Sequence, residues 1–394
     1  MTTSDLAHGE PERWVLQFCH GYNGPFLDCA RQYAVLFKGT SYKVCTVYLT
    51  GKPSAEVERG SASDEVIFLD YSSAQVRGLK LGAIRDLRRI ATSRDFALCI
   101  AHRFKPIYVA LLGSNLPVIG VHHAFGDYKR RSRQLFANFF RKRLALLGVS
   151  NAVRDDMRAC LPDWPAERIE TLYNRIDVEA VQAEQVSREV ARDHLGLPQD
   201  AWIVGNVGRL HPDKDQATLI RGFALALPQL PAGSLLAIMG SGRLEAQLKA
   251  LAAELGVSDS VRFLGQVPNG RRYFKAFDVF VLTSDHEPFG MVLLEAMACG
   301  TPVVATDCPG GTREILDDGR LDMLVPTGDD RAMADAILRT LDQPVQTNEM
   351  ARKVEEFTLE RAVDTYLELA LGPQAIRRPA VHSPMAQPRA GANR

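Results

Sequence analysis

The stretch VLTSDHEPFGMVLLEAMACGTPVV, residues 281–304, decides how this chain folds. An apolar run ends at Thr283, a short polar turn follows, and MVLLEAMAC then has the composition of a buried helix. Pro288 near the start of that helix and Gly300 just past its end fit the rules for helix ends. The next apolar run begins after Pro302. The order strand, helix, strand predicts two parallel strands joined by a crossover helix.

The same alternation extends outward through most of the chain. Short apolar runs alternate with segments of helical period, and each run is nearly continuous in its apolar character. Such runs are typical of parallel sheets that are covered on both faces by helices. The expected strands are residues 14–19, 42–49, 96–100, 117–121 and 145–150 in the first half, and 202–207, 234–240, 260–265, 278–283, 302–307 and 322–326 in the second.

We therefore expect an α/β protein with two doubly wound, Rossmann-like domains. The first domain is assigned to residues 1–195 and the second to residues 196–371, with the break near HLGLPQDA (194–201). Ligands of such sheets bind at the carboxyl ends of the strands, which predicts a site in a cleft between the domains. Residues 351–371 are expected to form terminal helices. Residues 372–394, rich in proline and arginine, are expected to be a disordered basic tail.

Composition excludes several classes of protein. The chain has 394 residues, with 47 basic and 47 acidic side chains, so its zero formal net charge gives no argument for nucleic-acid binding. No apolar stretch is long enough for a membrane-spanning helix, and the polar N-terminus does not resemble a secretory signal. The 7 cysteines include no C-x-x-C pair, so we expect neither a disulfide framework nor a zinc site, and a cytoplasmic location.

Basic side chains are concentrated in one short stretch. The first 195 residues carry 27 basic and 22 acidic side chains, and the excess is centred on residues 129–143. Two interpretations remain open: an amphipathic helix on an anionic membrane surface, or a helix packed into the core with a solvated basic rim. A second basic run at residues 77–94 favours the membrane. The first stretch combines Lys129, Arg130, Arg131, Arg133, Arg141, Lys142 and Arg143 with Leu135, Phe136, Phe139 and Phe140.

Two glutamates flank the expected helix of the opening stretch. Glu287 lies just before it, and Glu295 lies inside it among apolar residues. A carboxylate in such surroundings is costly unless it accepts strong hydrogen bonds, and a helix N-terminus is a ready site for an anion. A ligand site is one interpretation. The other is that Glu287 only caps the helix and Glu295 faces solvent.

A second polar loop follows the expected strand at residues 202–207. In GNVGRLHPDKD (205–215), Gly208 permits a tight turn, and Arg209 and Lys214 then project from the carboxyl end of the strand. Two cations at this edge suit a diphosphate, with arginine as a fork and lysine as a point charge. Solvated loop cations are the alternative interpretation.

With these two segments in place, the chain resembles glycosyltransferase family 4, whose members are retaining nucleotide-sugar enzymes of the GT-B fold. The resemblance implies two domains that face each other across a cleft, with C-terminal helices crossing back. EPFGMVLLEAMACGTPVVAT resembles the E-x7-E signature of the family, and GRLHPDKD resembles its G-R-x-x-x-x-K diphosphate loop. The resemblance covers roughly residues 95–370 and is most specific in the second half. Bacterial enzymes that extend lipopolysaccharide core or other surface glycans look most similar. Further similar segments are GSGRLEAQLKALAAELG, VRFLGQV, GGTREIL, AHRFKP, VSNAVRDDM and LYNRIDVE.

The resemblance implies roles for the residues that bind the donor. Arg209 and Lys214, after Gly208, would hold the diphosphate, and Glu295 would accept hydrogen bonds from the ribose. Glu287 would bind the donor sugar and stabilise its charge as a catalytic residue. The backbone at Phe289, Gly290 and Met291 would contact the same sugar, and the strand edge at Phe263 would contact the base.

The resemblance also implies roles in the N-terminal domain. Gly21 and Gly24 of HGYNG (20–24) would approach the acceptor or a phosphate, together with Arg103. His102 and His123 would lie near the reacting sugar as catalytic residues. The chain departs from the family at this loop, which has isolated rather than adjacent glycines. It also departs in LYNRID, where Arg175 replaces the usual glycine.

The activity implied is hexosyl transfer with retention of configuration, from a nucleotide sugar, with a UDP-sugar favoured, to a lipid-linked glycan or oligosaccharide. No cofactor and no metal are expected, and Asp213-Lys214-Asp215 is interpreted as a chance D-x-D pattern. An anionic membrane surface is a further expected partner, with the protein peripheral on the inner face of the cytoplasmic membrane. The alternatives are a nucleotide-sugar epimerase or phosphorylase of the same fold, and a non-catalytic membrane-recruited scaffold.

Overall fold

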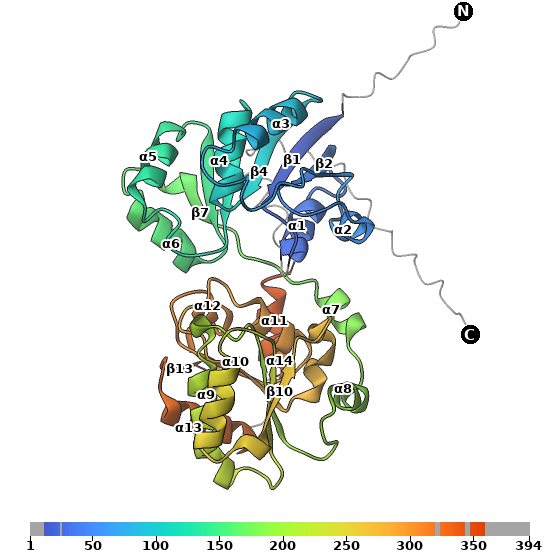
Figure 1. Ribbon diagram of the computed structural model, residues 1–394, viewed down its shortest axis with the longest axis vertical. Coiled ribbons are helices and arrows are strands. Elements are labelled where there is room, and N and C mark those ends of the chain that lie inside the picture. Colours follow the sequence, from blue (N-terminus) through green and yellow to red (C-terminus); the bar gives the residue numbers. More distant parts are fainter. Residues whose placement is uncertain (1–11, 24–25, 320–323, 343–346, 359–394) are drawn as a thin grey trace, which may run out of the picture.

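The structure is a computed structural model that describes residues 12–23, 26–319, 324–342 and 347–358. It has two lobes, each built on one parallel sheet with helices on both faces (Figure 1). The expected α/β architecture with two Rossmann-like domains is therefore confirmed. Gly24, residues 359–371 of the expected terminal helices and the basic tail at 372–394 lie outside the described residues.

The N-terminal sheet has seven strands in the order β3-β2-β1-β4-β5-β6-β7. Every neighbouring pair is parallel. The strands are β1 (Arg13–Cys19), β2 (Tyr42–Tyr48), β3 (Glu65–Phe68), β4 (Phe96–His102), β5 (Val118–His122), β6 (Leu144–Gly148) and β7 (Ile169–Thr171). The helices are α1 (Phe26–Val35), α2 (Ala55–Gly60), α3 (Leu81–Ala91), α4 (Phe104–Gly113), α5 (Arg131–Phe139) and α6 (Asn151–Cys160).

The C-terminal sheet has six parallel strands in the order β10-β9-β8-β11-β12-β13. They are β8 (Ile203–Val207), β9 (Leu235–Met239), β10 (Val261–Gly265), β11 (Val279–Leu282), β12 (Val303–Thr306) and β13 (Leu324–Val325). The helices of this lobe are α9 (Gln216–Ala226), α10 (Glu245–Glu254), α11 (Met291–Ala298), α12 (Thr312–Ile315), α13 (Asp330–Asp342) and α14 (Thr347–Glu355).

Burial explains why the apolar runs became central strands. In β5, β9, β11 and β12 every residue is buried, as expected where helices cover both faces of a sheet. Helix starts follow the sequence too: the Ser150 side chain accepts a hydrogen bond from the Val153 N–H and so caps α6.

The lobe boundary differs from the expected break at residue 195. The helices α7 (Val178–Glu184) and α8 (Arg188–Leu195) pack against the C-terminal lobe, and α8 is held there by Arg192. The Arg192 side chain is fully buried and donates to Asp278 Oδ2 at 3.0 Å. The N-terminal lobe thus ends with β7 and the turn after it. The lobe boundary in the structure thus lies about one helical hairpin before the expected break, and HLGLPQDA spans the end of α8 and the loop that follows it.

The lobes are joined by side-chain contacts as well as by the chain. Glu314 of α12 accepts hydrogen bonds from the backbone N–H groups of Asn151, at 3.1 Å, and Ala152, at 3.2 Å. A carboxylate of the second lobe therefore caps helix α6 of the first, where the helix dipole favours negative charge. Arg175 lies in the connection between the lobes, and its N–H donates to Gln32 Oε1 of α1 at 3.0 Å.

Candidate functional site

The loop after β8 is held against the loop after β11, as expected for neighbouring parallel strands. Thr283 Oγ1 donates to the Lys214 carbonyl at 3.0 Å, and the Asp285 N–H donates to the Asp213 carbonyl at 3.1 Å. Gly208 lies at the start of the first loop, where its N–H donates to the Met239 carbonyl at 3.0 Å. The two polar segments found in the sequence therefore form one site at the carboxyl edge of the sheet.

Lys214 and Glu287 form an ion pair at this edge. Lys214 Nζ donates to Glu287 Oε2, and Ser284 Oγ donates to the same oxygen at 3.1 Å. The two charged side chains are only 16% and 12% exposed. A pair so shielded from water is far less screened than a surface pair, so both charges are fixed in position for a ligand.

Arg209 extends from the same loop into solvent. Its side chain is 70% exposed, and Nη2 donates to Asp213 Oδ2 at 3.1 Å. Burial opposes ionisation of Asp213, but hydrogen bonding from His211 and the charges of Lys214 and Arg209 lower its pKa. Asp213 is thus a carboxylate that orients cations. Within the described ranges, no three His, Cys, Asp or Glu side chains are grouped as a metal site.

Two consecutive glycines lie against the backbone of Glu287. No individual role was expected for them from the sequence. Gly310 has φ +138°, and a Cβ there would lie 1.6 Å from the Glu287 carbonyl oxygen. A Cβ on Gly311 would lie 2.4 Å from the Phe289 carbonyl oxygen. The Gly311 N–H donates to the Glu287 carbonyl at 2.9 Å. Only glycine permits this close backbone approach, so GGTREIL fixes the position of the Glu287 backbone.

Helix α11 begins directly after Gly290, which has φ +103° and makes no side-chain cap. The first N–H groups of a helix have no intrahelical partner, so those of Met291 and Val292 remain available to a ligand, whereas the Leu293 N–H donates to the Gly290 carbonyl at 2.9 Å. The Phe289 side chain is buried, with ring centroids 6.0 Å from Tyr173 and 5.6 Å from Phe357. Its ring anchors the turn, and contact of the turn's backbone with a sugar remains a prediction.

Glu295 lies one turn after Met291 on α11 and lines a cavity between the lobes. This inter-lobe cavity, of about 270 Å³, is lined by Asp28 of α1 and by Arg271, Met291 and Glu295 of the second lobe. Burial raises the pKa of Glu295 to about 7, although the charge of Arg271 opposes that rise. Arg271 is itself paired with Glu184 through two hydrogen bonds of 2.6 and 2.7 Å. Glu295 therefore has the surroundings of a group that accepts hydrogen bonds from a ligand.

Phe263, expected near the base, lies on β10 at the edge of the sheet. Lys249 Nζ lies 5.5 Å from the centroid of its ring. Contact with a base remains a prediction for this residue.

A cavity in the N-terminal lobe brings together the residues expected on the acceptor side. This histidine cavity, of about 270 Å³, is lined by His20 and Gly21 after β1, by Thr50 after β2, and by His102 and Arg103 at the end of β4. These three strands are neighbours in the sheet. His20 was missed as a site residue, although the first position of HGYNG directly follows an expected strand.

His123 supports His102 rather than lining the cavity. Its Nε2 lies 3.1 Å from His102 Nδ1, and the two rings are stacked with centroids 5.4 Å apart. Burial lowers the pKa of His102 to about 3 and holds that of His123 well below its ordinary value. Both imidazoles are therefore neutral near pH 7. Gly21 is explained by packing, since a Cβ there would lie 2.8 Å from Thr50 Oγ1.

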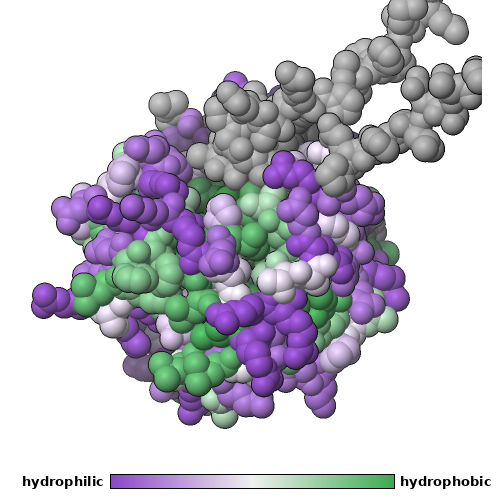
Figure 2. Space-filling model, turned by 90° about the horizontal axis from the view of Figure 1, so that it is seen from above, coloured by the Kyte–Doolittle hydropathy of each residue, from purple (hydrophilic) through white to green (hydrophobic). Residues whose placement is uncertain are grey.

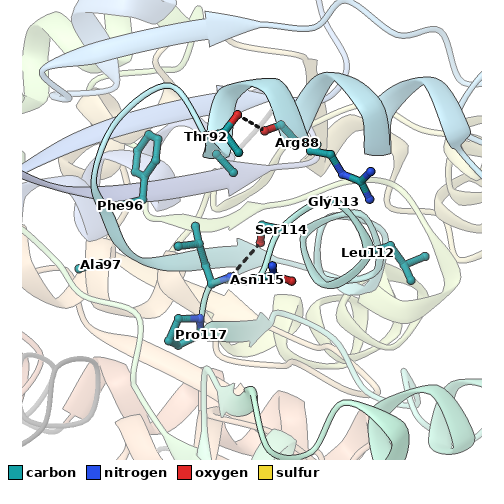
Figure 3. A pocket seen from close by; sticks show the side chains of 11 residues that line it. Arg88, Thr92, Phe96, Ala97, Leu112, Gly113, Ser114, Asn115 and Pro117 are labelled. Carbon is teal, nitrogen blue, oxygen red and sulfur yellow. Dashed lines mark hydrogen bonds between the residues drawn. The ribbon is translucent and has the colours of Figure 1, made fainter.

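A further cavity of about 430 Å³ lies at the opposite edge of the same sheet (Figure 3). It is lined by the C-terminal ends of α3 and α4 and by the first residues of β4 and β5, including Arg88, Asn115 and Pro117. The Thr92 hydroxyl donates back to the Arg88 carbonyl at 3.0 Å. None of the residues expected in the active site lines it.

The basic stretch at 129–143 is divided between core and surface. Helix α5 ends at Phe139, and Phe136 stacks on Tyr108 of α4 with ring centroids 4.9 Å apart. Leu135 and Phe139 point outward and are 63% and 81% exposed. The four apolar residues of this stretch are therefore divided, since Phe136 and Phe140 pack against the core whereas Leu135 and Phe139 do not.

Exposed cations surround the outward pair. Lys129, Arg130, Arg131, Arg141 and Lys142 are exposed, and we call them, with Leu135 and Phe139, the α5 surface. The end of the molecule formed by the N-terminal lobe carries apolar patches among strongly hydrophilic side chains (Figure 2). No helix in the described part of the chain is long and apolar enough to cross a membrane.

Two Rossmann-like lobes, with a cation–carboxylate pair and an open helix N-terminus at the carboxyl edge of the second sheet, define the GT-B class of α/β protein. Residues 39–180 match the family described as Glycosyltransferase Family 4, and residues 187–358 match Glycosyl transferases group 1. The two matches leave little of the described chain uncovered. The N-terminal lobe thus matches one glycosyltransferase family and the C-terminal lobe matches another.

Relatives in the curated proteins match over part of their length. The lipopolysaccharide core biosynthesis glycosyltransferase LpsE of Rhizobium meliloti is 34% identical over 226 residues, which cover 54% of this chain and 64% of the relative. A D-inositol 3-phosphate glycosyltransferase of Thermomonospora curvata is 36% identical over 196 residues, 46% of this chain and 45% of the relative. The chain thus matches less than two thirds of these relatives.

Solved structures share the whole fold at low identity. A glycosyltransferase from Rickettsia africae has a TM-score of 0.78 at 14% identity, with coverage of 93% of this chain and 100% of that one. Anabaena Alr3699/HepE in complex with UDP and glucose has a TM-score of 0.71 at 21% identity, with 91% and 99% coverage. These similarities establish the arrangement of both lobes.

Proposed function

We propose that this protein is a retaining glycosyltransferase that transfers a hexose from a nucleotide sugar, with a UDP-sugar favoured, to a lipid-linked glycan such as lipopolysaccharide core. The observation that carries the proposal is the Lys214–Glu287 pair beside the uncapped start of α11, with Glu295 on the same helix. The lipopolysaccharide core relatives support the acceptor class, and the UDP complexes of the Anabaena protein support the base.

The charges at this edge match the charges that the reaction develops. Cleavage of a glycosyl–diphosphate bond leaves negative charge on the diphosphate, which Arg209, Lys214 and the N-terminus of α11 stabilise. The sugar becomes positively charged, and the Glu287 carboxylate stabilises it. Because Lys214 already pairs with Glu287, both charged side chains are in position before the donor binds.

The acceptor attacks from the N-terminal lobe, on the face of the sugar that the diphosphate leaves. A general base is not required if the departing phosphate takes the acceptor proton. The low pKa of His102, about 3, fits this route, because an imidazole with so low a pKa is a poor base near neutral pH. His102 instead orients the acceptor through a hydrogen bond, and His123 holds the His102 ring in place.

The first experiment is a calorimetric and thermal-shift screen against UDP, GDP, ADP, dTDP and their common sugars, with and without EDTA. We expect one nucleotide class, UDP, to stabilise the protein regardless of EDTA, and Arg209→Ala to lose that effect. No response to any nucleotide would contradict the proposal. Metal independence is a prediction that the EDTA arm decides. Retention is tested by the anomeric configuration of the product.

The acceptor's lipid places the enzyme at a membrane, and we propose that the α5 surface docks on anionic lipid. We expect Leu135→Ser/Phe139→Ser to weaken sedimentation with phosphatidylglycerol vesicles at low salt by at least about tenfold, because two exposed apolar side chains no longer insert. Leu225→Ser is the matched control, since Leu225 is 52% exposed on the other lobe. Equal binding of both variants would refute docking through this surface.

A further inference from the structure

The histidine cavity has an unusual balance of charge. Among the residues that the structure describes, none of the side chains that line it is a carboxylate, whereas Arg103 contributes a cation. The guanidinium of Arg103 lies 4.4 Å from the centroid of the Phe26 ring and forms no ion pair with the residues that the structure describes. A second cation, Lys105, is close enough to lower the pKa of His20. The cavity is therefore electropositive without an internal counterion.

Two imidazole nitrogens of the cavity have no partner. His20 Nδ1 and His102 Nε2 are buried, and neither forms a hydrogen bond within the described residues. His102 is only 4% exposed, and its other nitrogen already faces His123. Buried polar atoms are almost always paired, so two orphans in one cavity indicate groups that wait for a ligand. When His123 Nε2 donates to His102 Nδ1, His102 Nε2 carries an N–H, as an oxyanion requires.

Backbone strain at Arg103 independently marks the same place. Arg103 has φ 75° and ψ 162°, a region that is essentially reserved for glycine. The strain puts this side chain at the start of α4, directly after β4. Such strain persists where the surrounding structure enforces it, and it is concentrated at ligand sites.

We propose that the histidine cavity binds an oxyanion carried by the acceptor sugar, either a phosphate monoester or a carboxylate. The inference rests on the proposed function and adds the chemical class of its acceptor. Arg103 supplies the charge and a fork of N–H groups, and His20 and His102 supply single N–H groups. A neutral sugar would leave the guanidinium uncompensated.

The proposal is tested by calorimetry on the full chain. Glucose 6-phosphate, glucuronate and glucose are titrated in the presence of saturating UDP, and inorganic phosphate serves as the minimal probe. We expect at least one anionic sugar to bind at least tenfold more tightly than glucose. Whichever of glucose 6-phosphate and glucuronate binds more tightly shows whether the cavity prefers a phosphate or a carboxylate. The affinity for glucuronate should change little between pH 8 and 6, because burial and the charges of Lys105 and Arg103 lower the pKa of His20 to about 4 and leave it neutral in that range.

Arg103→Gly is the decisive variant, because it removes the cation and also relieves the strained backbone. We expect anion affinity to fall at least tenfold while the Tm does not fall and UDP affinity stays within twofold. His20→Asn is the second variant, with a smaller loss of anion affinity. Arg339→Ala, which removes an exposed cation of α13, is the matched control and should change nothing.

Three outcomes would overturn the inference: equal binding of glucose and its anionic relatives, full anion affinity in Arg103→Gly, or competition between the anion and UDP. The last would assign the cavity to the donor diphosphate. Failure of the proposed function looks different, because no nucleotide would then bind in any arm.

Discussion

Replacing Lys214 by alanine separates the structural role of the Lys214–Glu287 pair from its role in donor binding. Within the described part of the chain, the substitution leaves a carboxylate that is 12% exposed with only the Ser284 hydroxyl, 3.1 Å away, as a side-chain donor. Removal of one partner from a fully buried pair costs about 3–5 kcal/mol. Because this pair keeps some contact with water, we expect Lys214→Ala to lower the free energy of unfolding by about 2–3 kcal/mol.

The double variant Lys214→Ala/Glu287→Gln should recover most of that stability, because the unpaired charge is gone. Its affinity for UDP should nevertheless stay low. A charge-assisted hydrogen bond to the diphosphate contributes about 1.5–3 kcal/mol, so both variants should bind UDP about 10- to 150-fold more weakly. Chemical denaturation measures the first quantity and calorimetry the second. Unchanged UDP affinity in Lys214→Ala would refute the assignment of this lysine to the diphosphate.

Two further predictions test the supports of the donor site. Burial raises the pKa of Glu295 from 4.5 to about 7. Between these pH values the folded chain holds a proton that the unfolded chain has lost. The stability that this proton contributes is therefore lost as the pH rises through 7. Thermal unfolding of Glu295→Gln should therefore lack this loss between pH 5 and 8, and a parallel pH dependence would contradict the burial argument. Gly310→Ala should destabilise the protein by more than about 3 kcal/mol, because the new Cβ clashes with the Glu287 carbonyl and because alanine is strained at this positive φ. Gly328→Ala, at φ +71° with nothing within 4 Å, isolates the backbone cost at about 1–2 kcal/mol, and equal losses in the two variants would refute the clash.

The sequence was most informative where one strand, one loop and one helix carry the signal together. The loops after β8 and β11 lie at the ends of neighbouring parallel strands that are buried except for Val207, so their meeting followed from the topology of a parallel sheet. The strands β3 and β7 were not expected. Both are outermost in the N-terminal sheet, where burial is incomplete, and β7 has only 3 residues, so neither has a continuous apolar run.

Contacts between distant segments could not be predicted from the sequence. Gly310 supports Glu287 across the ends of β11 and β12, and no local pattern indicates that the two backbones touch. The pairing of Glu314 with the start of α6 joins residues more than 160 positions apart. His20 escaped notice for a related reason, because its cavity takes residues from three strands, and burial rather than residue type makes its nitrogen an orphan.

The cap that Glu314 places on α6 has a consequence for protein engineering. Proteins with two such lobes can be recombined into chimeras that join the N-terminal lobe of one protein to the C-terminal lobe of another. Here such an exchange would remove the carboxylate that two N–H groups of the recipient helix require, at a cost comparable to the loss of a helix cap, about 1 kcal/mol. A sequence alignment would not reveal that a junction in the linker separates Glu314 from α6. A working hybrid has to carry Glu314 and the first turn of α6 as one transferable unit.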